Sequence, residues 1–180
     1  CFEHLHDLAD YFTVNVSSPN TEGLRELQEK GRLLEILGEL ERRNRERDSG
    51  AVPIFLKIAP DLSFHQIGEI IQVVEESGVS GIVATNTTIG RETLPAGVEY
   101  ERGGLSGAPV RNRSTEIIRF LSRETGGKMP LIGVGGICDS ASAAEKLDAG
   151  AHLVQLYTGW IYRGPFFART LARSLRFYAE

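Results

Sequence analysis

The sequence predicts an α/β protein made of the last five strand–helix units of a (β/α)₈ barrel, also called a TIM barrel. Five apolar segments rich in β-branched residues recur along its 180 residues, and segments with helical periodicity separate them. Most are continuous apolar runs, which is typical of parallel strands covered on both faces. Polar or glycine residues follow each run, at the position where a barrel places its active site.

Each of the predicted strands is short, and each is separated from the next by a helical pattern or a loop. The strands are expected at Tyr11–Val16, Ile54–Ala59, Gly81–Thr85, Leu131–Val134 and Leu153–Tyr157.

The helix expected after the second strand has the clearest boundaries. Ser63 and Gln66 have the spacing of a capping box, in which each residue satisfies a free backbone N–H of the other. Gly78 stands where a glycine commonly ends a helix. Between them, apolar residues recur at the spacing of one helix face, at Ile67, Ile70, Ile71 and Val74.

Four other helices are expected, and one long segment is not periodic. Ile89–Pro109 is rich in glycine and long enough to be a functional loop. The helices are marked by Leu24, Leu27, Leu34 and Leu37; by Ile117, Ile118 and Leu121 before Gly126-Gly127; by Ala143, Ala144 and Leu147 before Gly150; and, for the last, by a start near Pro165 that continues to the end.

Two architectures fit this order of elements: a doubly wound sheet and a barrel. Strand–helix–strand units predict parallel strands with right-handed crossovers in both. The barrel is favoured because every strand carries polar or glycine residues at its carboxyl end, whereas a doubly wound sheet concentrates them at one switch point. These strand ends are Asn15–Asn20, Lys57–Pro60, Thr85–Thr88, Gly133–Gly136 and Tyr157–Gly159.

Five units are fewer than the eight that close such a barrel. An open partial barrel exposes two strand edges and half of its core, which favours aggregation. We therefore expect residues 1–180 to be one partial barrel domain, with three N-terminal units absent from the sequence.

Composition excludes several classes of function. The net charge is −4, so no general attraction to nucleic acid or anionic lipid is expected. Cys1 and Cys138 form neither a disulfide framework nor a metal-binding spacing. No apolar run approaches the roughly 18 residues that cross a bilayer as a helix.

Lys57 is the most informative single residue. It lies in the apolar segment Ile54–Ala59, which contains no other charge. Burying an ammonium group without a partner costs several kcal/mol, so an anionic or strongly accepting group is expected to face it. An electron-rich cofactor that becomes negative on reduction would serve. The alternative is an edge-strand lysine whose amine reaches water.

Asn15 and Asn86 are candidate ligand-reading residues at the ends of two strands. Each amide offers two donors and one acceptor, which suits a small ring with alternating C=O and N–H groups. The alternative for either residue is that it ties down a neighbouring loop. The segment Asn15–Thr21 carries more polar residues than helix capping requires, and its Ser18 could remove a proton only from an activated acid in a dry site.

The segment Gly133–Gly136 is a candidate phosphate-binding turn. Its glycines let backbone N–H groups approach an anion, and a helix cap is expected at Asp139-Ser140. Together with Tyr157–Gly159 it matches the phosphate site that many barrels form after strands seven and eight. Trp160, Tyr162, Phe166 and Phe167 are expected to pack against the last strand or within the last helix.

Six short motifs, in order and with suitable gaps, resemble the dihydroorotate dehydrogenase family, and they cover nearly the whole chain. They are NVSSPNT at Asn15–Thr21, LKIAPDL at Leu56–Leu62, TNTT at Thr85–Thr88, GGLSGAP at Gly103–Pro109, GVGG at Gly133–Gly136 and QLYTG at Gln155–Gly159.

The resemblance implies a barrel that binds FMN and oxidises dihydroorotate to orotate in de novo pyrimidine (UMP) biosynthesis. Ser18 would be the catalytic base that takes the C5 proton while hydride passes from C6 to flavin N5. Lys57 would contact the flavin and stabilise its reduced anionic form. The implied substrate-binding residues are Asn15, Asn20, Asn86 and Thr87. The implied FMN-binding residues are Asn15, Lys57, Thr85, Gly107, Gly136, Tyr157 and Thr158, and no metal is implied.

Serine at position 18, where the cytosolic branch has cysteine, indicates the class 2, quinone-dependent branch. Quinone would bind through the absent N-terminal region. The complete protein would then be a peripheral protein on the cytoplasmic side of the bacterial inner membrane, with the mitochondrial inner membrane as the alternative. The 180 residues alone are expected to bind FMN weakly and to be inactive.

Two other interpretations remain open at this point. One is another FMN barrel that acts on dihydropyrimidine or dihydrouridine, although the latter would need a basic RNA-binding face. The other is a non-catalytic folding or interaction unit.

Overall fold

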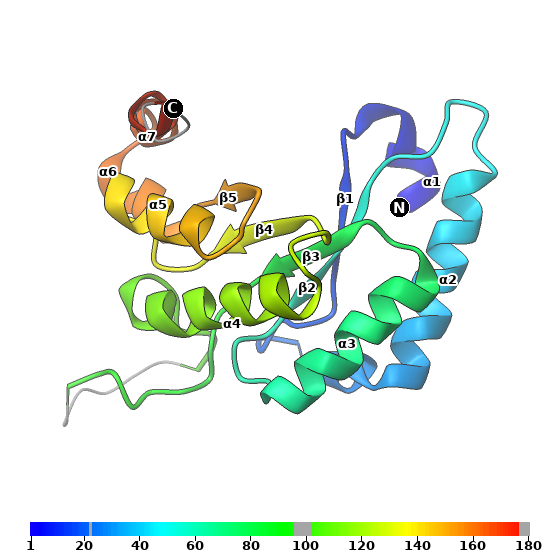
Figure 1. The fold of residues 1–180 in the computed structure, drawn as a ribbon, viewed down its shortest axis with the longest axis horizontal. Coiled ribbons are helices and arrows are strands. Elements are labelled where there is room, and N and C mark those ends of the chain that lie inside the picture. Colours follow the sequence, from blue (N-terminus) through cyan, green and yellow to red (C-terminus); the bar gives the residue numbers. More distant parts are fainter. Residues whose placement is uncertain (22, 96–101, 177–180) are drawn as a thin grey trace.

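The structure is a computed structural model that describes residues 1–21, 23–95 and 102–176. Its centre is one sheet of five parallel strands in the order β1-β2-β3-β4-β5 (Figure 1). Each predicted strand is present, with ends that lie up to two residues inside the expected ones. The strands are β1 (Phe12–Asn15), β2 (Ile54–Ile58), β3 (Gly81–Ala84), β4 (Leu131–Val134) and β5 (Leu153–Gln155).

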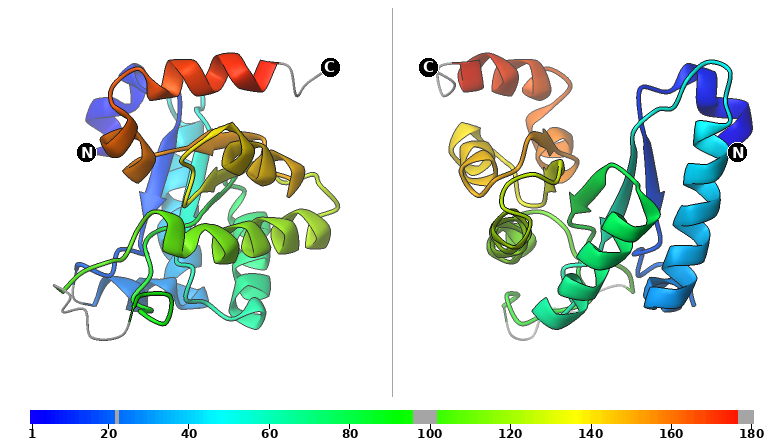
Figure 2. Two further views of the ribbon diagram at one scale, coloured as in Figure 1. Left: turned by 90° about the vertical axis from the view of Figure 1, so that its left-hand side faces the viewer. Right: turned by 45° about the vertical axis from the view of Figure 1, so that its right-hand side comes forward.

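The strand order decides between the two architectures that the sequence left open. A doubly wound sheet reverses its strand order at a switch point and carries helices on both faces. Here each strand pairs only with its neighbours in sequence, and the large helices lie on one side of the curved sheet (Figures 1 and 2). The fold is therefore an incomplete (β/α)₈ barrel, as predicted.

Helices follow every strand, and they are listed here with their short 3₁₀ segments. They are α1 (Phe2–Leu5), η1 (His6–Leu8), η2 (Leu24–Gln28), α2 (Lys30–Arg45), α3 (Phe64–Ser77), η3 (Ala108–Val110), α4 (Arg111–Glu124), α5 (Ser140–Asp148), α6 (Thr158–Arg163) and α7 (Phe167–Leu175).

Local capping sets the helix boundaries that the sequence predicted. Ser63 and Gln66 form the expected capping box at the start of α3, and Gly78 ends that helix in the left-handed conformation with φ of 77°. Asp139 caps α5 through the backbone N–H of Ser142 at 2.7 Å. The main core lies between the helices and the outer face of the sheet, and it includes fully buried Leu33, Leu56 and Ile82.

The inner face of the sheet carries a smaller cluster of Phe55, Val83 and Ile132. These three residues alternate along their strands with residues of the main core, as the two-residue period of a strand requires. Asn15 and Lys57 are register partners on neighbouring strands, so both side chains belong to the same inner face.

The C-terminal region differs from the expectation. The last helix, α7, begins at Phe167, near the expected start, and a short helix that the sequence did not predict, α6, precedes it and ends before Gly164; residues 177–180 lie outside the described part of the chain. Phe167 packs beside Leu171 as predicted. Trp160, Tyr162 and Phe166, however, are 42%, 85% and 73% exposed, so their predicted packing is wrong. The physical reason is that β5 is an edge strand here, with no further strand for these side chains to contact.

The long loop expected at Ile89–Pro109 is only partly described, because residues 96–101 lie outside the described ranges. Its two ends are joined by an antiparallel bridge between Thr88 and Leu105, with N···O distances of 3.0 and 2.8 Å. Among the described residues, none of the helices combines the length and apolar character needed to cross a membrane.

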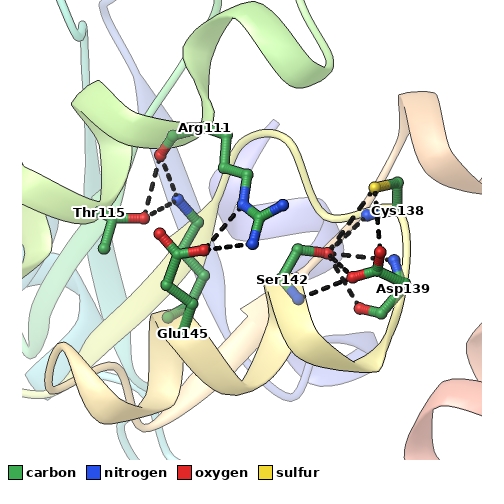
Figure 3. Close-up of polar contacts among 7 residues, drawn as sticks. Arg111, Thr115, Cys138, Asp139, Ser142 and Glu145 are labelled. Atoms are coloured by element: carbon green, nitrogen blue, oxygen red, sulfur yellow. Dashed lines mark hydrogen bonds and ion pairs between the residues drawn. The ribbon is translucent and has the colours of Figure 1, made fainter.

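Lys146 on α5 is fully buried, which the sequence did not suggest. Its Nζ donates to the carbonyl oxygen of Arg111 at 2.8 Å and to Thr115 Oγ1 at 2.7 Å, both at the start of α4. Beside it, Arg111 Nε donates to Glu145 at 2.7 Å (Figure 3). Burial lowers the pKa of Lys146 to about 8. The lysine therefore joins α4 to α5 by two hydrogen bonds, but burying its charged amine costs free energy.

We expect Lys146→Met to leave the free energy of unfolding unchanged or to raise it by ~1–2 kcal/mol at neutral pH, because it removes a buried charge. The acceptors keep a partner, since Thr115 Oγ1 donates to the Arg111 carbonyl at 3.0 Å. Lys146→Ala should instead lower the free energy of unfolding by ~2–4 kcal/mol, because it leaves a cavity. Urea unfolding of the purified protein measures both values.

The same substitution should change how stability depends on pH. The folded pKa of about 8 lies below the ordinary 10.5, so the unfolded chain binds more protons between these values. The free energy of unfolding of the unmodified protein should therefore increase as pH rises through this window. The difference in free energy of unfolding that favours Lys146→Met at neutral pH should shrink over the same range. A difference between the two proteins that stays constant from neutral pH to about 10 would contradict the assignment.

Candidate functional site

A cavity of about 190 Å³ lies at the carboxyl ends of β2 to β5. It is lined by the strand ends and by the loop before α4, so residues from distant parts of the sequence meet there. The lining residues are Lys57, Thr85, Asn86, Thr87, Ser106, Gly107, Val110, Val134, Gly135, Gly136, Ile137, Gln155, Leu156, Tyr157, Thr158 and Gly159.

Lys57 is the charged residue of this cavity. It is partly buried, and burial lowers the pKa of its amine. Its Nζ makes no hydrogen bond or ion pair with any residue in the described ranges. Its register partners are Asn15 on β1 and Val83 on β3, so the amine has apolar and amide neighbours within the sheet. A partly desolvated cation without a protein partner requires an electron-rich ligand or water.

Thr85, directly after β3, supplies a second unsatisfied group. Its side chain is 2% exposed, and its Oγ1 has no hydrogen-bond partner among the described residues. Buried hydroxyl groups are nearly always bonded, so one that lines a cavity indicates a missing ligand or ordered water. Lys57 and Thr85 therefore both point to a polar ligand in the same cavity.

Asn15, Ser17 and Asn86 form a bonded cluster beside the cavity. Asn86 Nδ2 donates to Asn15 Oδ1 and to Ser17 Oγ, each at 3.0 Å, and Ser17 Oγ donates to Asn15 Oδ1 at 3.2 Å. Asn86 Oδ1 accepts from the backbone N–H of Thr87 at 2.9 Å. Both N–H donors of Asn86 are thus engaged, whereas Asn15 has its Nδ2 donor free of any partner in the described part of the chain.

The opposite end of the cavity is a glycine-rich cradle. Gly136 has φ of 71°, and any Cβ there would collide with Arg111. Gly107 has φ of 81° and lies against Thr158. Thr158 and Ser106 share a hydrogen bond of 2.8 Å. Backbone N–H groups and hydroxyls gathered in this way suit an anion such as a phosphate.

Ser18 and Asn20 lie in the loop after β1, outside the lining of the cavity. Ser18 is partly buried, and its Oγ accepts from the backbone N–H of Asn20 at 3.3 Å. Asn20 Oδ1 accepts from the backbone N–H of Gly104 at 3.0 Å, which leaves its Nδ2 without a partner among the described residues. Both residues are at the same end of the sheet as Lys57, since Asn15 and Lys57 are register partners.

Of the residues predicted from the sequence, most lie together at this cavity. Six of the predicted FMN-binding residues line it, and so do two of the predicted substrate-binding residues. They are Lys57, Thr85, Gly107, Gly136, Tyr157 and Thr158, and Asn86 and Thr87. Asn15 joins them through Asn86, while Asn20 and Ser18 occupy the neighbouring loop. The structure places these residues, and their roles remain predictions.

Sequence reasoning missed three residues of this region. Ser17 is fully buried and bonds both asparagines. Ser106 lines the cavity beside Thr158. Gly104 lies so close to Thr87 and Pro19 that a Cβ would collide with both. Each belongs to a motif that the sequence analysis quoted, but their contacts are long-range, so the motif alone did not distinguish them from their neighbours.

Arg91 and Asp61 anchor the loop that carries Gly104. The guanidinium of Arg91 donates to the carbonyls of Thr88 at 3.2 Å and Gly103 at 2.5 Å, so it joins the two arms of the loop. Asp61 accepts a hydrogen bond from Thr88 Oγ1. These contacts hold the N–H of Gly104 against Asn20, and they set the direction in which the Asn20 amide points.

Comparison with known proteins agrees with this arrangement. The family profile described as dihydroorotate dehydrogenase matches residues 1–177. A protein of Christiangramia forsetii named dihydroorotate dehydrogenase (quinone) is 52% identical over 174 residues, which are 97% of this chain and 51% of that protein. A protein of the same name from Chromobacterium violaceum is 50% identical over 184 residues, which cover 100% of this chain and 54% of the relative.

Solved structures match as well. Crystal structures of DHODH from Eimeria tenella, ligand-free and in complex with ferulenol, superpose with TM-scores of 0.90 and 0.89 at 34% identity. They cover 97% of this chain and 52% and 51% of those chains. The chain thus spans about half the length of the curated relatives and of these solved structures.

We expect Gly104→Ala to displace residues 103–105 from Asn20, because the added Cβ would collide with Thr87 and Pro19. Loss of one hydrogen bond costs about 1 kcal/mol, so amide hydrogen exchange of the peptide 102–106 should accelerate by roughly fivefold. Gly68→Ala on α3 is the control, since nothing lies within 4 Å of its added Cβ. Equal exchange of this peptide in both variants would show that Gly104 is not held against Asn20.

Proposed function

The chain belongs to the dihydroorotate dehydrogenase family, and we propose that the complete protein oxidises dihydroorotate to orotate in de novo pyrimidine synthesis. We further propose FMN as the hydride acceptor and quinone as the final electron acceptor. The observation that carries the proposal is that the partly buried amine of Lys57 and the buried hydroxyl of Thr85 line the same cavity, and neither has a hydrogen-bond partner among the described residues.

The cavity fits FMN in the chemistry of its groups. Lys57 and Thr85 offer unsatisfied polar atoms at the sheet, where the ring system would lie. Gly136, Tyr157 and Thr158 lie at the glycine-rich end, which suits the phosphate. Gly107, with its left-handed φ of 81°, would bring its backbone close to the cofactor.

FMN would supply the two-electron acceptor for hydride from the substrate. The chain's own contribution is electrostatic: the Lys57 cation would stabilise negative charge that develops beside it on reduction. Because the amine is partly desolvated, its interaction with such a charge is stronger than it would be in water.

The free amide donors support a substrate that is rich in acceptors. Asn15 Oδ1 and Asn20 Oδ1 are both engaged by protein donors, so each side chain offers its NH₂ group to a ligand. Dihydroorotate and orotate carry a carboxylate and two ring carbonyls, all of which accept hydrogen bonds. Thr87 and Asn86 would hold the same ligand, Asn86 through the remaining lone pair of its Oδ1, because both of its N–H donors bond within the protein.

Ser18 is proposed as the catalytic base that takes the C5 proton. Its Oγ already accepts one hydrogen bond from the Asn20 N–H, which helps to fix the direction of its remaining lone pair. A serine hydroxyl removes a proton only when the carbon acid is activated, bulk water is excluded and the hydroxyl's own proton has an exit from the site. The proton lost from C5 and the hydride lost from C6 together convert the substrate's C5–C6 single bond to a double bond.

The electron acceptor and the location are also proposals. The curated relatives described above carry "(quinone)" in their names, and serine at position 18 agrees with that branch. Quinone would reach the protein through a region outside these 180 residues. The complete protein would then be peripheral to the bacterial inner membrane on its cytoplasmic side, or alternatively to the mitochondrial inner membrane.

In the complete protein, Ser18→Ala should retain FMN but reduce it with dihydroorotate at least ~100-fold more slowly, because a general base contributes about 10²–10⁴-fold. Ser18→Cys is the matched variant, since a thiol at this position can still accept the proton and should preserve part of the rate. Stopped-flow absorbance of the flavin measures the step. Undiminished reduction in Ser18→Ala would show that another group is the base.

Lys57→Met should weaken FMN binding in the complete protein or lower the flavin reduction potential, because it removes the cation that faces the ring. Lys146→Met is the control, since it also removes a buried lysine but one that does not line the cavity. Flavin content and redox titration distinguish the two variants. Identical spectra and potentials in both would exclude Lys57 from the cofactor site.

A further inference from the structure

The charge of the chain is distributed unevenly along the sequence. The net charge is −4, yet no acidic residue occurs between Asp148 and Glu180. The same segment contains four arginines, at positions 163, 169, 173 and 176. The C-terminal region that follows α5 is therefore strongly basic, although the chain as a whole is acidic.

Two of these arginines lie on the outer face of α7, and Arg176, the residue directly after its last turn, continues the same row. Leu171 is buried, and Phe167 and Leu175 pack beside it against the α5 region. Arg169, Arg173 and Arg176 are spaced at i, i+4 and i+7 and are all exposed. At 100° per residue this spacing places them on one side of the helix, opposite the side that carries Leu171.

The guanidinium groups of this row have no partner among the residues that the structure describes. Elsewhere in the chain exposed arginines bond to neighbouring glutamates, as Arg42 does to Glu39 and Arg123 to Glu124. In the described part of the chain, no ion pair or hydrogen bond involves the side chains of the row. The sequence from residue 149 to residue 179 contains no acid to pair with them, so the row is available for an external anion.

Exposed aromatic side chains accompany the row. α6 contacts α7, and it carries Tyr162 at 85% exposure beside Arg163. Phe166, at the start of α7, is 73% exposed. Figure 2 shows α6 and α7 next to each other at one end of the molecule. These aromatic residues lie near β5, the edge strand of the incomplete barrel, which accounts for their exposure, so the arginine row alone indicates an external anion.

We propose that the outer face of α7, through Arg169, Arg173 and Arg176, binds the anionic headgroups of a lipid bilayer. The proposal rests on the proposed function in one respect: quinones are apolar and dissolve in membranes, so an enzyme that reduces them must meet a lipid surface. The arginine row supplies the charge complementarity, and the acidic remainder of the chain orients the protein, because it is repelled by the same surface.

The test uses the complete protein with FMN bound and measures its partition onto vesicles. The triple variant Arg169→Gln, Arg173→Gln, Arg176→Gln is compared with a control that removes the same charge elsewhere, Arg32→Gln, Arg119→Gln, Arg123→Gln. Each arginine near an anionic surface contributes about 1 kcal/mol, so the α7 variant should bind phosphatidylglycerol-containing vesicles ~100-fold more weakly. The control variant should bind like the unmodified protein, and phosphatidylcholine vesicles should not distinguish the three proteins.

Two enzymatic readouts separate this proposal from the function on which it rests. Oxidation of dihydroorotate with a water-soluble acceptor should be equal in all three proteins, while reduction of quinone embedded in anionic vesicles should fall in the α7 variant alone. Failure of all three proteins to oxidise dihydroorotate would refute the proposed function and leave the vesicle result valid.

Two results would overturn the lipid assignment. One is equal partition of the α7 variant and the control onto anionic vesicles. The other is a fall in the melting temperature of the α7 variant with unchanged partition, which would show that the row pairs with an acidic segment of the same protein.

Discussion

The feature on which the site depends is a cation in the sheet that has no counter-charge within residues 1–21, 23–95 and 102–176. Lys57 lies on the inner face of β2 between Asn15 and Val83, and burial lowers the pKa of its amine. A protein bears this cost when a ligand compensates it. The unsatisfied hydroxyl of Thr85 opens into the same cavity, so the ligand must supply polar groups to both. A flavin ring, which carries carbonyls and gains negative charge on reduction, meets both requirements.

The continuous order of the strands brings the rest of the site to these two residues. Because all strands are parallel and pair in sequence, their carboxyl ends meet at one rim, and residues from position 15 to position 158 become neighbours. Two different sets of polar groups occupy two parts of this rim. Backbone and hydroxyl groups around Gly136 and Thr158 suit a phosphate, whereas the free amide donors of Asn15 and Asn20 suit the acceptors of a small pyrimidine.

The sequence predicted what is decided locally. The capping box at Ser63, the left-handed Gly78 and the apolar strands depend on near neighbours, and they are found as expected. What it missed depends on distant contacts. Lys146 is buried because the start of α4 offers it acceptors, and Phe166 is exposed because β5 has no further neighbour. The net charge of the whole chain likewise did not predict the basic C-terminal helix, because the first 148 residues contain more acidic than basic residues.

The most direct test of the account is a crystal structure of the complete protein as purified, with its flavin content determined on the same sample. We predict FMN in the cavity at the carboxyl ends of the strands, with ring atoms within hydrogen-bonding distance of Lys57 Nζ and Thr85 Oγ1. A carboxylate from the remainder of the protein paired with Lys57, with no flavin beside it, would contradict the account.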